Sequence, residues 1–148
     1  MMYRILLAVN DNREIASSLV DSVNQIINIV DTCEITLVHV FRDADVLQRV
    51  SIHQLTSGYN EDEFEHQIPL SVRETASALE NTSATVEIKF ASGDPPTEIT
   101  QIAENMDVDN IYIGGKNTSP AGKAIFGSTT QSVLFNTETP VTICGSIE

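Results

Sequence analysis

Short aliphatic runs alternate along this chain with longer segments whose apolar residues recur every three or four positions. The run Tyr3–Val9 is almost entirely aliphatic, and Ile15, Leu19 and Val23 follow it at helical spacing. A short run of this kind is typical of a strand buried on both faces, whereas spacings of three and four mark one face of a helix. The alternation predicts a mostly parallel sheet with right-handed crossovers and helices on both faces.

The same alternation continues to the end of the chain. Helices are expected in the segments between five strands, which we place at Tyr3–Val9, Ile35–Val40, Thr85–Ala91, Asn110–Gly114 and Pro140–Cys144. The signal is weakest from Phe41 to His66, where the acidic run Glu61–Glu65 is interpreted as a solvated face. The sequence therefore predicts an open five-stranded α/β sheet.

Local signals mark where two of the helices begin. Asn12 or Asp11 is expected to cap the first helix, because a side-chain oxygen there accepts one of the free backbone amides. Asp94 is followed by two prolines, and prolines suit a first helical turn, where no backbone donor is needed. A later helix is therefore expected to start at that point.

Length and apolar content bound the architecture. The chain has 148 residues, 41% of them apolar, which fits one domain over residues 1–148 with an ordinary buried core. It has no run of about 18 apolar residues of the kind that spans a membrane. The short apolar run at its start is followed at once by acidic and amide residues, unlike a signal peptide. We therefore expect a cytoplasmic protein in which Cys33 and Cys144 are free thiols.

The net charge narrows the choice of partners. Aspartate and glutamate number 21 against 8 lysines and arginines, which gives a charge of −13. Such a field repels nucleic acid and anionic membranes, so we expect neither as a partner. The apolar fraction is too high for disorder of the whole chain to explain the charge. We interpret the acidic surface as a halophilic adaptation to a salty cytoplasm, where dissolved ions screen self-repulsion and carboxylates keep the protein dispersed.

A long polar loop follows the fourth expected strand. The stretch 113–133 holds four glycines and seven Ser, Thr or Asn residues, and it leads into a helix that begins near Gly127 and Ser128. Parallel sheets bind ligands beyond the carboxyl ends of their strands, and the free amides of a helix start suit a phosphate. Lys116 and Lys123, two of only three lysines in the chain, lie in this loop and favour an anion site. A surface loop closed by a serine cap is the alternative interpretation.

Three motifs resemble the universal stress protein family. They are the opening ILLAVN-DN, the stretch SGDPPTEI, and the pattern G-x2-G-x9-G-[ST] of ATP-binding members, which Gly114, Gly127 and Ser128 fit. Two positions depart from the family. Its second glycine falls on Asn117, and asparagine tolerates the left-handed backbone better than other non-glycine residues, so we expect the turn to survive. The family's aspartate near the adenine falls on Asn10, which offers an amide donor and no charge.

The resemblance implies a Rossmann-like sheet of the adenine nucleotide alpha hydrolase type, with strand order 3-2-1-4-5. It also implies bound ATP or a related adenine nucleotide, with or without magnesium. Residues implied near the adenine and ribose, or on the floor below them, are Ala8, Asn10, Val38, Ile113 and Gly114. Residues implied at the phosphates are Asn117, Gly127, Ser128 and Thr129. The last strand, Val141 to Cys144, is implied to pair with its copy in a homodimer, since a terminal edge strand exposes unpaired backbone groups.

The expected role is that of a stress-response signalling or regulatory protein, in which the nucleotide acts as a signal and not as fuel. Local sequence supports no Ser/His/Asp or Cys/His arrangement, and His39 lies within a strand, where a structural histidine is expected. His53 and His66 have no metal-ligand spacing. We therefore expect no catalytic residues, no metal centre and at most slow ATP hydrolysis. Two alternatives stay open: an interaction module of the same fold that has lost nucleotide binding, favoured by Asn10 and Asn117, and a weak ATPase.

The acidic surface predicts a stability that depends on salt. The repulsion between carboxylates falls as the Debye length shortens from about 10 Å at 0.1 M salt to about 3 Å at 1 M. We expect the melting temperature, followed by circular dichroism, to rise as sodium chloride is increased over this range. A melting temperature that does not change with salt would contradict the interpretation as an adaptation.

Overall fold

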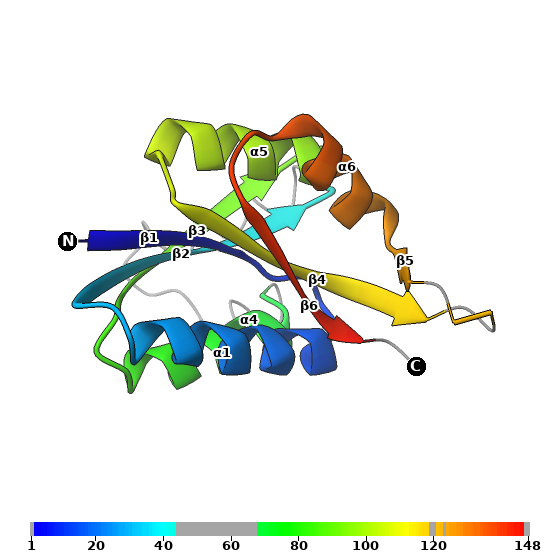
Figure 1. Ribbon diagram of the computed structural model, residues 1–148. Coiled ribbons are helices and arrows are strands. Elements are labelled where there is room, and N and C mark those ends of the chain that lie inside the picture. The colour runs from blue at the N-terminus through cyan, green and yellow to red at the C-terminus, as the bar shows by residue number, and fades with distance from the viewer. Residues whose placement is uncertain (1, 44–67, 119–120, 123, 147–148) are drawn as a thin grey trace.

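A parallel β-sheet lies between two layers of helices (Figure 1). A computed structural model of the chain describes residues 2–43, 68–118, 121–122 and 124–146. The strands are β1 Met2–Ala8, β2 Thr32–Phe41, β3 Thr85–Ser92, β4 Asn110–Thr118, β5 Ala124–Phe126 and β6 Val141–Ser146. The helices are α1 Arg13–Ile27, α4 Leu70–Glu80, α5 Pro95–Met106 and α6 Ser128–Asn136. Across these ranges, no helix is both long and apolar enough to cross a bilayer.

Five of the strands run parallel, in the order β3-β2-β1-β4-β6. The strand expected last from the sequence is β6, so the predicted order 3-2-1-4-5 is confirmed. Two strands are longer by several residues than the apolar pattern indicated. β2 begins at Thr32 instead of Ile35, and β4 continues past Gly114 to Thr118. The carboxyl ends of β1, β2 and β4 meet at one edge of the sheet, because the strands are parallel.

The short strand β5 was not predicted. It pairs antiparallel with the far end of β4, where Lys116 lies opposite Phe126. Lys116 is also paired with Ser146 of β6, so β5 lies along the other edge of β4, the edge that β1 leaves after Tyr112. Three residues in a polar loop carry too little apolar periodicity to indicate a strand. Pairing with the free edge of β4 makes them extended.

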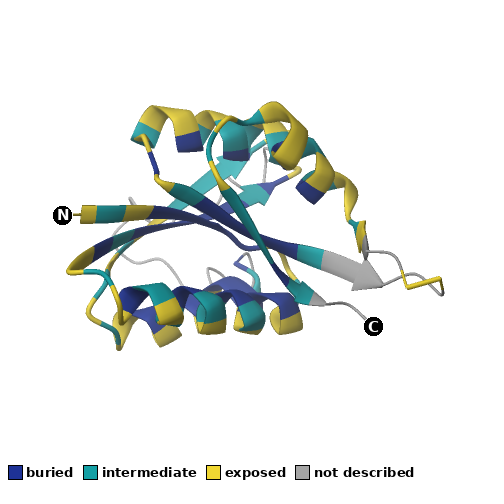
Figure 2. Cartoon of the chain, in the orientation of Figure 1, coloured by how far each residue is buried: buried dark blue, intermediate teal, exposed yellow. Residues whose placement is uncertain are grey.

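Strand β1 shows how the sheet builds a core on each face. Ile5 and Leu7 belong to one buried cluster, and Leu6 and Ala8 belong to the other, as the alternation of side chains along a strand requires. The helices α1 and α4 cover the first face, and α5 and α6 cover the second (Figures 1 and 2). Buried residues that these helices contribute are Leu19, Val23, Leu79, Ile99, Ala103 and Val133. Burial on both faces explains why the strands are almost continuously aliphatic.

Two helix starts near the carboxyl edge agree with the predicted caps. The side-chain oxygen of Asn12 accepts the backbone N–H of Ile15 at 3.0 Å, and α1 begins directly after it. Asp94 occupies the corresponding position before α5, with two prolines in the first turn. Its carboxylate accepts a hydrogen bond from the Thr97 hydroxyl at 2.6 Å and none from a backbone amide of the helix. Both helix starts border the edge of the sheet where ligands are expected.

Both cysteines are buried and free, as predicted. Burial raises the pKa of the Cys33 thiol, because an apolar environment disfavours the thiolate. Burial also raises the pKa of Cys144, although a hydrogen bond with Ser22 acts in the opposite direction. Neither thiol therefore has the features of a reactive cysteine.

Candidate functional site

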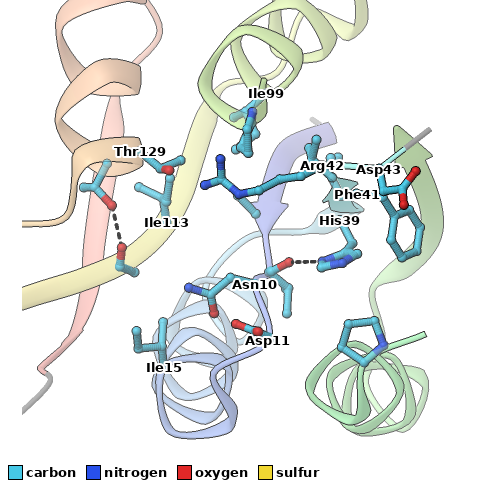
Figure 3. Close-up of a pocket in the computed structure, with 18 residues that line it drawn as sticks. Asn10, Asp11, Ile15, His39, Phe41, Arg42, Asp43, Ile99, Ile113 and Thr129 are labelled. Carbon is cyan, nitrogen blue, oxygen red and sulfur yellow. Dashed lines mark hydrogen bonds between the residues drawn. The ribbon is translucent and has the colours of Figure 1, made fainter. Parts of the chain in front are cut away.

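A cavity of about 530 Å³ opens at the carboxyl ends of β1, β2 and β4 (Figure 3). This volume lies within the range of about 300–1,000 Å³ that is typical of small-molecule sites. Residues of α1, α5 and α6 complete its wall. Six of the nine residues predicted from the sequence to contact a nucleotide line this cavity: Ala8, Asn10, Val38, Ile113, Gly114 and Thr129.

The other three predicted residues lie near the end of β4 and at the start of α6. Gly127 and Ser128 are exposed there and are not part of the cavity wall. The left-handed turn expected at Asn117 is not found, because that residue lies in β4 and is paired with β5. The side chains of Asn117 and Lys116, and the whole of Lys123, lie outside the described part of the structure.

Gly114 is required by packing inside the protein. A Cβ atom placed on this residue would lie 1.9 Å from the Cγ2 atom of Ile15 and 3.0 Å from the carbonyl oxygen of Cys144. The carbonyl of Gly114 in turn accepts a hydrogen bond of 2.6 Å from the hydroxyl of Thr130, which is buried. The glycine lets α1 lie directly against β4, and Thr130 ties α6 to the same point.

Gly127 has no such requirement. Its φ of −63° is open to any residue, and a Cβ atom placed there would meet no atom of the described structure within 4 Å. Its N–H donates to the carbonyl of Gly115 at 3.1 Å. No side chain of the described residues caps α6 at this end. The glycine therefore leaves open space beside the free amides of a helix start, where the helix dipole is positive.

Asn10 is held by two hydrogen bonds at the end of β1. Its side-chain oxygen accepts the backbone N–H of Asn12 at 2.9 Å, and its backbone carbonyl accepts the Ser71 hydroxyl at 2.5 Å. Because the N–H of Asn12 is a donor, the atom that meets it must be the amide oxygen and not the amide nitrogen. Asn10 thus presents an NH2 group, and no further carboxylate-like acceptor, to the cavity that it lines.

His39 is buried, with 8% of its surface exposed, and lines the cavity from β2. Its Nδ1 atom lies 2.8 Å from the carbonyl oxygen of Val9, which can only accept, so Nδ1 carries the proton. Its ring also meets the ring of Phe41 edge-on, with centroids 4.8 Å apart. These contacts agree with the structural role predicted for this histidine.

Sequence reasoning missed several residues of the cavity wall. Those not predicted from the sequence include Ile15, Phe41, Arg42, Pro95 and Ile99. The sequence did carry one signal for Arg42. Side chains along a strand alternate between the two faces of a sheet, so Arg42 is expected on the same face as Val40. The residues on α1, α5 and α6 carry ordinary helix signals, and only the packing of the helices brings them to the cavity.

The described residues contain no group of three or more His, Cys, Asp or Glu side chains placed to hold a metal ion. His53, His66 and the acidic run Glu61–Glu65 lie outside those residues. The wall of the cavity offers amide, hydroxyl and guanidinium donors and the carboxylates of Asp11 and Asp43 over a largely apolar floor, and an apolar lining with a few polar groups is typical of small-molecule sites.

A model of the universal stress protein family matches residues 2–145 of the chain. The chain belongs to the universal stress protein family. The match spans β1 to β6 and thus includes every segment that lines the cavity. No curated protein matches this universal stress protein significantly.

Solved structures of universal stress proteins share its fold at low sequence identity. One from Archaeoglobus fulgidus has a TM-score of 0.70 at 21% identity, covering 97% of this chain and 99% of its own. A universal stress protein from the same organism in complex with dAMP has a TM-score of 0.66 at 18% identity, covering 96% and 97%. A family protein from Arabidopsis thaliana with AMP bound has a TM-score of 0.63 at 15% identity, covering 99% and 92%. The likeness establishes the α/β fold.

The two motif glycines are expected to respond differently to alanine. Gly114→Ala should lower the free energy of unfolding by about 1–3 kcal/mol or more, because the added methyl group overlaps Ile15 in a packed core. Gly127→Ala should change it by less than about 0.5 kcal/mol, since the position is open. Urea unfolding of each variant at one fixed high salt concentration measures both values.

A double variant identifies the cause. Ile15→Ala removes the methyl group that the alanine at 114 would meet. The double variant should therefore lose less free energy of unfolding than the two single variants, Gly114→Ala and Ile15→Ala, lose together. If the two losses of free energy simply add, or if Gly114→Ala and Gly127→Ala are equally stable, then the contact with Ile15 is not the reason that position 114 requires glycine.

Proposed function

We propose that this universal stress protein binds ATP or a related adenine nucleotide, with or without magnesium, and acts in the cytoplasm as a stress-response regulatory homodimer. The observation that carries the proposal is the open space at Gly127, beside free amides of α6 and two residues before Thr129 in the cavity wall. The complexes of related proteins with dAMP and AMP support it.

The apolar part of the cavity suits a purine ring. Ala8 and Val38 come from the ends of β1 and β2, Ile113 from β4 and Ile99 from α5, so apolar groups converge from four elements. A flat aromatic ring buried among them is removed from water on both faces. Asn10 at the rim supplies amide donors, which pair with an acceptor on the base or the ribose.

The phosphates then lie at the start of α6. The first amides of a helix lack partners within it and carry partial positive charge, which favours an anion. Ser128 is exposed and Thr129 half-buried at this point, so their hydroxyls add donors. The absence of a side chain at Gly127 lets an anion approach the backbone closely.

The nucleotide acts as a signal in this proposal, because the described cavity wall pairs no nucleophile with a general base. The Nδ1 atom of His39 is committed to the Val9 carbonyl. A ligand that contacts both the turn after β1 and the start of α6 stabilises the arrangement in which the two are held together, and so shifts the population toward it. Slow ATP hydrolysis is compatible with this role.

A second function is favoured by the geometry of Asn10. Its amide oxygen is occupied by the N–H of Asn12, so the residue cannot reproduce the acceptor that an aspartate in its place would offer. A chain of the same fold that has lost nucleotide affinity would act as a protein-interaction module. Whether the purified protein contains a bound nucleotide distinguishes this function from the first one.

The proposed homodimer uses the free edge of β6. Within the described structure β6 pairs with β4 alone. The carbonyl of Pro140 accepts the N–H of Ile111 and so faces β4. The N–H and C=O groups of successive residues point to opposite sides of a strand. The N–H and C=O of Thr142 therefore also face β4, whereas those of Val141 and Ile143 face outward. Pairing with a second copy satisfies them.

The first prediction of this proposal concerns the purified protein. We expect protein purified in molar salt and then denatured to release an adenine nucleotide in a ratio near one per chain, identified by chromatography and mass analysis. Protein that is empty, and that also fails to take up added ATP with magnesium, would contradict nucleotide binding and support the interaction module.

A matched pair of loop variants tests where the phosphates bind. Gly127→Ala is expected to weaken nucleotide affinity at least about tenfold while the melting temperature stays within a few degrees, because its methyl group occupies only the space proposed for the phosphates. Ala121→Ser serves as the control, since it also adds a single heavy atom at an exposed position of the same loop, where φ is not left-handed. Equal affinities for the two variants would place the phosphates elsewhere.

The homodimer predicts a sedimentation mass twice that of one chain. Ile143→Pro removes an outward N–H that we assign to the dimer interface and leaves the bonds between β4 and β6 in place, so it should yield a folded monomer. Circular dichroism confirms folding, and sedimentation equilibrium measures the mass. A wild-type monomer, or a variant that stays dimeric, would rule out pairing through this edge.

A further inference from the structure

Arg42 is the first residue after β2, and the strand determines which way its side chain points. Successive side chains along a strand alternate between the two faces of a sheet. Phe41 belongs to the core beneath α1 and α4, whereas Val38 and Val40 pack in or against the core beneath α5 and α6. The Phe41 carbonyl accepts the N–H of Gly93 at 2.9 Å, which holds the end of the strand. The alternation therefore places Arg42 on the side of α5 and α6.

The side chain of Arg42 extends across the cavity (Figure 3). Its guanidinium group lies beneath Ile99 and points toward Ile113 and Thr129. Thr129 belongs to the first turn of α6. Arg42 thus reaches from β2 toward the region that the proposed function assigns to the phosphates.

The charge of Arg42 is unusual for its surroundings. Among the described residues that line the cavity, it is the one lysine or arginine, and the other charged side chains there are the carboxylates of Asp11 and Asp43. Its side chain is exposed and forms no ion pair with the residues that the structure describes. A chain of net charge −13 repels an anionic ligand at long range. A guanidinium group in the cavity counteracts that repulsion locally.

Building on the nucleotide site proposed above, we propose that Arg42 contacts a phosphate of the bound nucleotide and makes the site prefer nucleotides to nucleosides. A guanidinium group binds phosphate oxygens through two parallel hydrogen bonds, a geometry that lysine cannot reproduce. Its other favourable contact is stacking on the face of the base. The direction toward Thr129 favours the phosphate, because the guanidinium group and the first turn of α6 then approach one anion from opposite sides.

Affinities for ligands that differ only in phosphate content test this role. Isothermal titration calorimetry at one fixed salt concentration would measure Kd for adenosine, AMP and ATP with the wild-type protein, Arg42→Gln and Arg42→Lys. In Arg42→Gln we expect Kd for AMP or ATP to rise about ten- to a hundredfold, as for loss of a charged hydrogen bond, while Kd for adenosine stays within about twofold. Arg42→Lys should recover part of the loss, because it keeps the charge without the planar fork.

Arg4→Gln is the matched control, since Arg4 is an exposed residue near the start of β1, at the opposite edge of the sheet. It removes the same charge and should leave all three affinities unchanged. Equal losses for adenosine and AMP in Arg42→Gln would overturn the phosphate contact in favour of stacking on the base. Equal effects of Arg4→Gln and Arg42→Gln would overturn it in favour of net charge alone. A wild-type protein that binds none of the three ligands would instead overturn the nucleotide site itself, and this inference with it.

Discussion

The contact between Ile15 and Gly114 is the constraint on which the cavity depends. The Ile15 side chain occupies the space where a larger residue at 114 would place its Cβ, and Gly145, with φ of +83°, leaves a similar space on β6. Helix α1 therefore lies close against β4 and β6. Asn10 precedes α1 and the loop to α6 follows Gly114, so the same contact brings both segments to one edge of the sheet.

The two motif glycines serve different physical purposes. Gly114 is needed by the fold, because its replacement would collide with Ile15, whereas Gly127 has an ordinary backbone conformation and open surroundings. Packing therefore explains one of these two motif positions and leaves the other open. In the function that we propose, the position that packing does not explain is the one that contacts the nucleotide.

Local patterns predicted most of the architecture and part of the site. Aliphatic runs and helical spacings are properties of short segments, so five parallel strands and the Asn12 cap could be inferred from neighbouring residues. The strand order came with the family resemblance. The extended backbone at Asn117 could not be predicted, because it results from pairing with β5, and β5 itself exists only where β1 leaves an edge of β4 unpaired.

The sequence by itself determined which segments form strands and helices, that the ligand edge lies at their carboxyl ends, and that Asn10 and Thr129 belong near it. Only the tertiary structure decided that position 114 requires glycine because of Ile15. It also decided that Arg42, directly after β2, and Thr129, in α6, face the same cavity. The physical reason is that periodicity records which face of an element is buried. The distance between faces of different elements is set by how closely the helices pack on the sheet.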